Sequence, residues 1–225
     1  MTHAVLKIGL RVSRFSRLLQ VKAIDLICEE NVSTQPLNPQ KIKTLSQLYK
    51  ALDGLYKGID EYCSSCNDPD CMGYVWLLKQ EAKTLYEHGV SMIQTDNGST
   101  FIHSFPENKL GELDLAVRYP PCPHVDNRRC NIHQSRPLNC RLYPIGLEVK
   151  DGKIIWAIHL DCLYTRKLEE HGLLIDFKFR AKNVINNLSS ELLKEIVETY
   201  QKVYAITFFP YGENNYQFLQ EVNYV

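Results

Sequence analysis

Apolar residues recur every three or four positions along several stretches of the chain, which is the spacing of a helix with one buried face. The first stretch follows Asn38-Pro39, a pair that favours a helix start because Asn caps the first turn and Pro fits within it. A second helix is predicted over residues 73–88, and helical structure is predicted from Cys162 to about Tyr204. The apolar positions of the first and last stretches are Ile42, Leu45, Tyr49, Leu52, Tyr56 and Ile59, and Leu188, Leu192, Ile196, Tyr200 and Val203.

The residues between these helices favour short strands. A turn signal at Asp96-Asn97-Gly98-Ser99 separates residues 92–95 from residues 100–105, which predicts a hairpin, and residues 115–119 resemble a further strand. A clearer hairpin joins residues 145–149 to residues 154–160 through the tight turn Asp151-Gly152. The spacing of apolar residues in the aromatic tail after Phe208 matches neither a helix nor a strand. We therefore predict an α+β fold in which helices flank short antiparallel hairpins.

Composition narrows the class of protein. The 225 residues, 44% of them hydrophobic, suffice for one sizeable core or for a domain with an appendage. The 26 basic and 26 acidic residues cancel, so charge gives no reason to expect nucleic acid as a partner. No run approaches the roughly 18 apolar residues of a membrane-spanning helix. We expect no nucleic-acid partner and no membrane span.

Residues 1–38 are predicted to form a basic N-terminal segment and linker ahead of a domain over residues 39–225. Every charged residue from Lys7 to Lys22 is positive, and leucines recur there at near-helical spacing. A helix that packs on the domain, or a poorly ordered arm, is the preferred interpretation; the alternatives are an organelle transit peptide and a segment that touches a membrane surface. Because no continuous apolar stretch indicates a secretory signal, we expect a cytoplasmic protein with reduced thiols.

Seven of the eight cysteines fall in two groups, a pattern that favours metal binding over disulfides in a chain without a secretory signal. The first group lies in a loop between two predicted helices, and prolines keep the loop of the second group compact. The two groups are Cys63, Cys66 and Cys71, and Cys122, Cys130, Cys140 and Cys162. Cys28 stands alone and is interpreted as a buried core residue. Because eight is an even number, a disulfide set stays open as an alternative.

The hairpin over residues 145–160 is predicted to bring Cys140 and Cys162 together, which would complete the second group. His133 lies midway between Cys130 and Cys140 and is preferred to His124 as a nitrogen ligand. His159, on the strand before Cys162, is interpreted as a packed strand residue.

Arginines surround the second group. Arg136 and Arg141 flank Cys140 closely, and we expect their guanidinium groups to offset the charge of the thiolates and to lower the thiol pKa values. Arg128 and Arg129 are interpreted as part of a solvated basic face.

The second block resembles the zinc- or iron-chelating domain family of YkgJ-like cysteine-cluster proteins. The matching segments are Cys122-Pro123, Cys130-Asn131-Ile132-His133, Arg136-Pro137-Leu138-Asn139-Cys140-Arg141-Leu142-Tyr143-Pro144 and Cys162. The likeness covers residues 63–162 and departs from the family at Met72, where many members carry a second adjacent cysteine. It implies binding of zinc or of iron, the latter as an ion or as an iron–sulfur cluster.

Three functions are compatible with these residues. The preferred one is a metal-binding protein without turnover, whose partners are the metal ion and a second protein. The alternative is an iron–sulfur enzyme or redox component, such as a protein-lysine N-methylase-like catalyst, since a similar cysteine block occurs in flagellin lysine N-methylases. No glycine-rich cofactor loop supports a methyltransferase independently. The third is a core-cysteine or disulfide protein that binds no metal.

Overall fold

The fold comes from a computed structural model, which describes residues 41–56, 58–59, 62–63, 74–104, 122–126, 129–207 and 215–223. The chain divides into residues 1–39 and 40–225, and every described residue belongs to the second unit. The predicted features that lie outside the described residues are the basic segment 1–38, Cys28, Cys66, Cys71, Arg128 and the strand over residues 115–119. None of the described helices is both long and apolar enough to cross a membrane.

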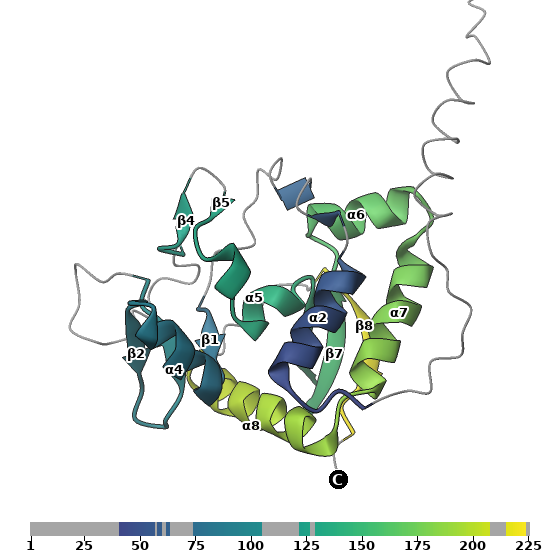
Figure 1. The fold of residues 1–225 in the computed structure, drawn as a ribbon. Helices are drawn as coiled ribbons and strands as arrows, with labels where there is room; N and C mark the ends of the chain where they lie inside the picture. Colours follow the sequence, from purple (N-terminus) through teal and green to yellow (C-terminus); the bar gives the residue numbers. More distant parts are fainter. Residues whose placement is uncertain are drawn as a thin grey trace, which may run out of the picture. The chain divides into compact units, whose positions relative to one another are not determined.

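The described part has an α+β fold, as the sequence predicts (Figure 1). Its helices are α2 (Leu45–Leu55), α4 (Lys79–Glu87), α5 (Leu138–Leu142), α6 (Leu163–Glu170), α7 (Leu174–Asn186) and α8 (Ser190–Thr207). One antiparallel sheet has the order β1-β3-β2 and consists of β1 (Trp76–Leu77), β2 (Met92–Gln94) and β3 (Thr100–Ile102). The other has the order β6-β7-β8 and consists of β6 (Ile145–Lys150), β7 (Lys153–His159) and β8 (Tyr216–Glu221). A short pair, β4 (Val125–Asp126) and β5 (Arg129–Cys130), forms a separate ladder.

Both predicted hairpins are confirmed. β2 and β3 pair from Met92↔Ile102 to Gln94↔Thr100. β6 and β7 pair down to Lys150↔Lys153, where the two turn residues, Asp151 and Gly152, have φ values of 52° and 75°. Two successive positive φ angles match the right-handed twist of the flanking strands, which is why an Asp-Gly pair closes this turn.

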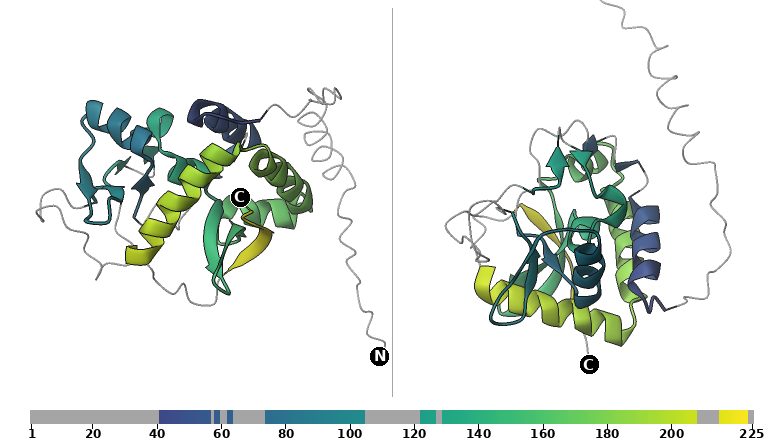
Figure 2. Two further views of the ribbon diagram at one scale, coloured as in Figure 1. Left: turned by 90° about the horizontal axis from the view of Figure 1, so that it is seen from below. Right: turned by 60° about the vertical axis from the view of Figure 1, so that its left-hand side comes forward.

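The main core lies between one face of the β6-β7-β8 sheet and the helices that cover it. Leu147, Trp156 and Ile158 alternate along their strands, so they share this face. α2 and α7 lie over it in two views (Figures 1 and 2), and both helices contribute side chains to the same cluster. The fully buried members from these helices and from α8 include Leu48, Leu52, Phe177, Ala181 and Ile196. The predicted apolar stripe of α2 therefore does face the core.

The predicted start of the first helix, at Asn38-Pro39, was several residues too early. α2 begins at Leu45, because Thr44 and Gln47 form a reciprocal capping box. Ile42, which was predicted to be helical, pairs instead with the chain before α8: its N–H donates to the carbonyl of Asn187 at 2.6 Å, and its carbonyl accepts from Ser189 at 2.8 Å. A residue with both backbone groups bound in a bridge cannot also enter a helix.

The second helix also starts later than predicted. Trp76 and Leu77 form β1, which pairs with β3, so α4 occupies only Lys79–Glu87. The alternating direction of strand side chains fits this pairing: both residues are buried, but Trp76 enters the main core, whereas Leu77 joins a second cluster with Leu85 and Ile102. Local periodicity over residues 73–88 could not reveal this pairing, because it depends on a strand more than 20 residues away.

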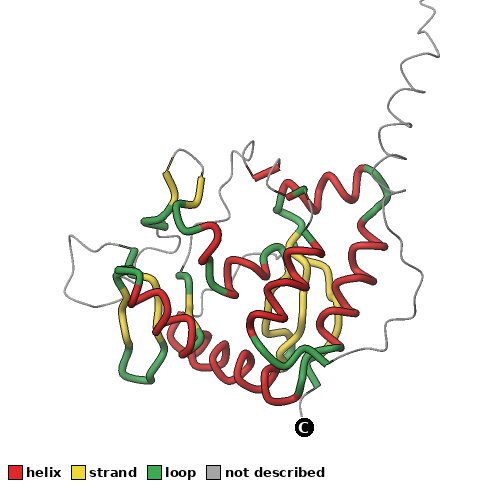
Figure 3. Tube along the Cα trace, in the orientation of Figure 1, coloured by secondary structure: helices red, strands yellow, loops and turns green. Residues whose placement is uncertain are grey.

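The helical run after Cys162 is confirmed and is divided into α6, α7 and α8, which Figure 3 shows as three red segments separated by loops. Gly172, with φ of 72°, ends α6.

The tail after Phe208, which the sequence left ambiguous, contains β8. This strand pairs with β7 from His159↔Tyr216 to Ile155↔Glu221, and a bulge next to Trp156 interrupts the pairing. Leu219 lies in the main core, which gives this aromatic strand its inward face.

A buried carboxylate joins three helices. Glu81 of α4, 6% exposed, accepts the Tyr49 hydroxyl from α2 and the Leu138 N–H at the start of α5 (2.5 Å) on Oε1. Its Oε2 accepts the Leu78 N–H at 2.8 Å. Burial raises the pKa of Glu81, and the three donors oppose that shift. All three donors point at acceptor atoms, as a buried carboxylate requires.

Replacing Glu81 by Gln should destabilise the protein, because the Gln amide nitrogen has to face at least one of these donors. We expect the free energy of unfolding to fall by about 3 kcal/mol. The matched control is Glu87→Gln at the exposed end of the same helix, which should change stability by less than about 0.5 kcal/mol. Urea denaturation measures both, and equal losses in the two variants would contradict the role assigned to Glu81.

Candidate metal-binding cysteines

Cys122 and Cys130 are brought together by the β4–β5 pair. Val125 lies opposite Cys130 in this ladder, and the N–H of Val125 donates to the Cys122 carbonyl at 3.2 Å. The strand pairing is extended by Asn131, whose N–H donates to the His124 carbonyl at 2.7 Å. Two cysteines that are eight residues apart thus lie on one small backbone framework. Both are half-buried and neither is in a disulfide.

The two thiols are near enough to influence each other's ionisation. Burial raises the pKa of the Cys122 thiol, and the neighbouring Cys130 raises it further, while a hydrogen bond from the His124 backbone opposes the shift. Two neighbouring thiolates repel each other, so a cation between them or nearby would favour the ionisation of both. Burial also lowers the pKa of His124, which favours its neutral imidazole.

Cys140 lies in the short helix α5. It packs together with Ile132 against the second core cluster of Val75, Leu85 and neighbouring residues. Its charged form would also raise the pKa of Tyr49, although burial and Glu81 are the larger causes of that shift. α5 therefore presents Cys140 from a short helix whose first N–H is bound to Glu81.

Cys162 is buried in the main core at the N-terminus of α6, where its carbonyl accepts from Thr165 Oγ1 at 2.9 Å. Cys63 is exposed and follows Tyr62, whose ring lies 5.5 Å from that of Tyr164. Tyr164 lies two residues after Cys162, so this ring contact joins the segments that carry Cys63 and Cys162. Although the predicted hairpin links Cys140 to Cys162, these two cysteines pack in different clusters.

Within the ranges that the structure describes, no three His, Cys, Asp or Glu side chains converge in a group that could hold a metal ion. Cys66 and Cys71 of the first predicted group lie outside these ranges. His133, the preferred nitrogen ligand, begins the 3₁₀ turn His133–Ser135 and is half-buried. Among the described members of the predicted site, Cys122 and Cys130 lie on one backbone framework.

Arg141 connects α2 to the loop that precedes α5. Its guanidinium donates to Asp53 of α2 at 2.8 Å and to the Gln134 carbonyl at 2.7 Å, and its Nε donates to the Arg136 carbonyl at 2.9 Å. The same group lies 4.4 Å above the ring of Tyr49. Arg141 is therefore a clamp that holds residues 134–136 against α2, a role that sequence spacing could not reveal.

Arg136 lies beside this clamp and is less completely bound. One of its guanidinium nitrogens lies 3.9 Å from Asp53, and its buried Nε has no hydrogen-bond partner among the described residues. A buried donor of this kind has capacity for a further acceptor. The effect predicted for Arg136 and Arg141 on the thiolates stays a prediction.

His159 is a packed strand residue held by specific partners. Its Nε2 lies 3.1 Å from Oε1 of the largely buried Glu148, and its ring stacks on Tyr143 with centroids 5.6 Å apart. The side chain crosses over Gly146, where an added Cβ would lie 2.8 Å from Nε2. Gly146 is therefore needed for close approach, which explains a glycine within a strand.

Glu81 and Tyr49 were missed by the sequence reasoning. The available signal was a carboxylate on the apolar side of α4, three residues after Leu78 and four before Leu85. Such a position predicts either a solvated residue or a buried group with partners, and only the tertiary structure shows the Tyr49 and Leu138 donors.

No protein-family model, no curated protein and no solved structure matches this chain. The resemblance to the YkgJ-like cysteine-cluster proteins rests on the motif residues of the second block.

Arg141→Lys should destabilise the protein although it keeps the charge. A lysine cannot reproduce the planar fork that binds Asp53 and two carbonyls, so we expect a loss of about 2 kcal/mol in the free energy of unfolding. Arg180→Lys is the matched control, because Arg180 forms a half-exposed pair with Asp176 on α7 at 2.9 Å. That control should change by less than about 0.5 kcal/mol, and a similar loss in both variants by urea denaturation would refute the clamp.

Proposed function

We propose that this chain is a metal-binding protein that chelates zinc or iron through clustered cysteine thiolates. The observation that carries the proposal is the pair of neighbouring thiols, Cys122 and Cys130, on the β4–β5 framework. Thiolates are soft ligands that suit zinc and iron–sulfur centres. A bound cation would also relieve the mutual repulsion of the two ionised sulfurs.

The remaining ligands are proposed from the sequence motif. A tetrahedral zinc site takes four nitrogen or sulfur ligands, so two thiols of the β4–β5 pair supply half of one site. The proposed set adds Cys63, Cys66, Cys71, Cys140, Cys162 and His133. Seven thiols exceed the need of one zinc ion, which leaves ligands for a second ion or for an iron–sulfur cluster.

Basic residues beside Cys140 fit such a centre. Four thiolates around a divalent ion carry a net charge of about −2. Arg136, whose buried Nε has no hydrogen-bond partner among the described residues, and Arg141 flank Cys140 in the sequence. Arg141 is held in place by Asp53 and two carbonyls, so its charge needs no further ordering when a metal binds.

Metal analysis of protein purified without oxygen tests the proposal. We expect either colourless protein with about one or two zinc ions per chain, or brown protein that contains iron together with acid-labile sulfide. Zinc would favour a metal-binding protein without turnover, and iron with sulfide would favour the redox or enzymatic alternative. Protein that contains neither metal, and takes up neither after reduction and reconstitution, would overturn the proposal.

Cys122→Ser and Cys130→Ser should each lose bound metal, because a serine hydroxyl is a poor ligand for a soft cation. Cys28→Ser is the control and should keep the full metal content. Cys122 and Cys130 are both half-buried and serine is similar in size, so circular dichroism should show a retained fold. Full metal content in both variants would exclude this pair from the site.

Cys140→Ala tests the centre of the motif. We expect loss of metal together with reduced stability, since Cys140 also packs against the second core cluster. Metal content has to be expressed per folded molecule, so that loss of packing is separated from loss of a ligand. An unchanged ratio in folded Cys140→Ala would remove this residue from the ligand set.

A further inference from the structure

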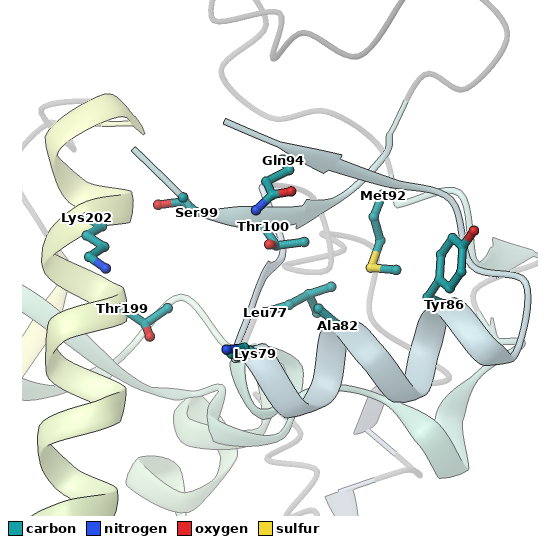
Figure 4. Close-up of a pocket in the computed structure, with 11 residues that line it drawn as sticks. Leu77, Lys79, Ala82, Tyr86, Met92, Gln94, Ser99, Thr100, Thr199 and Lys202 are labelled. Atoms are coloured by element: carbon teal, nitrogen blue, oxygen red, sulfur yellow. The ribbon is translucent and has the colours of Figure 1, made fainter. Parts of the chain in front are cut away.

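A pocket of about 610 Å³ lies between α4, the β1-β3-β2 sheet and α8 (Figure 4). This volume is within the range of about 300–1,000 Å³ that is typical of small-molecule sites. The pocket contains none of the cysteines or histidines discussed above. Its walls come from residues 77–100 and from Thr199 and Lys202 of α8, which is remote from them in sequence, so the tertiary fold creates the pocket.

The two ends of the pocket differ in chemistry. Near α8 the labelled side chains are Ser99, Thr199, Lys202 and, at the start of α4, Lys79 (Figure 4). Toward the other end of α4 the lining is apolar and aromatic, with Ala82, Met92 and Tyr86. A molecule that filled this space would therefore have one charged end and one apolar end.

Ser99 is the most informative residue of the polar end. It is only 3% exposed, and its hydroxyl has no hydrogen-bond partner among the described residues. The backbone of Ser99 is fully used by the β2–β3 turn: its N–H donates to Asn97 Oδ1 at 3.0 Å, and its carbonyl accepts from the Thr95 N–H at 2.9 Å. Buried hydroxyls are normally hydrogen-bonded, so this one has capacity for a ligand.

The polar end is held in place by the fold. Asn97, at the tip of the β2–β3 turn, donates to the carbonyl of Lys202 at 2.8 Å and so links the turn to α8. The exposed ammonium groups of Lys79 and Lys202 form no ion pair with any acidic residue that the structure describes. Two cations and a free hydroxyl on a fixed frame favour an anion over a neutral molecule.

We propose that this pocket binds a small organic anion, with a phosphate or carboxylate head at Ser99, Lys79 and Lys202 and an apolar body along α4 toward Met92 and Tyr86. The site is separate from the proposed metal centre and does not depend on it. The lysines set the charge of the ligand, and the apolar end sets the size of its body.

Calorimetric titration of the full chain at low ionic strength tests this proposal with phenyl phosphate, benzoate and the neutral benzyl alcohol. At least one of the two anions should bind with a Kd below about 10 mM, and its affinity should fall as salt is added. The stronger anion identifies the head group. Benzyl alcohol should bind at least about tenfold more weakly, because it lacks the charge.

Variants locate the site. Lys79→Gln combined with Lys202→Gln should weaken binding of the anion about tenfold, and Ser99→Ala should weaken it about fivefold. Lys83→Gln is the control, because Lys83 lies on α4 but does not line the pocket. Both lysines of the double variant are exposed, so folding should be unaffected.

The outcomes that would overturn the proposal are distinct. Neither anion binds below about 10 mM, or benzyl alcohol binds as tightly as the anions, or the double lysine variant binds as the unchanged chain does. A loss in Lys83→Gln equal to that in the double variant would show that only the overall charge matters. None of these results bears on the metal content that tests the proposed function.

Discussion

The buried carboxylate of Glu81 is the interaction on which most of the described structure depends. A charged group inside a core is costly unless every lone pair direction finds a donor. Here the donors come from α2, from the chain before α4 and from the start of α5, so the cost of burial is offset only when the three elements are assembled together. The interaction thus couples three helices into one cooperative unit, with Tyr49 as the link to α2.

α5 shows the consequence of that coupling. A helix of five residues is not stable alone, because nucleation costs more than its few hydrogen bonds return. Glu81 binds its first N–H, and Tyr56 donates its hydroxyl to the Leu142 carbonyl at its other end. Arg141, between these two ends, ties the preceding loop to Asp53. The core therefore determines where Cys140 lies, whereas Cys122 and Cys130 are positioned by a local backbone ladder.

Two faces of α4 have different roles. Glu81 and Leu85 point to the interior, one as the acceptor of three donors and the other as part of the second core cluster. Lys79, Ala82 and Tyr86, at spacings of three and four, lie along the pocket instead. Glu81 and Leu85 attach the inner face of α4 to the rest of the protein. The pocket-lining residues on the other face do not contribute to that attachment, so their polarity can vary along the helix. Stability and the proposed ligand contacts therefore reside on different faces of the same helix.

The sequence by itself determined the helices and turns that depend on interactions between neighbouring residues. The apolar stripe around Leu52 gave a helix, and the Asp151-Gly152 and Asn97-Gly98 turns gave hairpins, since helical period and turn conformation depend on neighbouring residues. The motif also predicted a metal-binding block, and the β4–β5 ladder, with the hydrogen bond from Val125 to the Cys122 carbonyl, brings two of its cysteines onto one backbone framework. Only the tertiary structure decided that Ile42 leaves the helix for a bridge, that Trp76 and Leu77 form a strand, and that Tyr216–Glu221 completes a sheet. It also placed Cys140 and Cys162 in different clusters and created the pocket at Ser99. Each of these features depends on contacts between residues that are distant in the chain. The spacing of residues along the sequence does not reveal the free energy of such contacts.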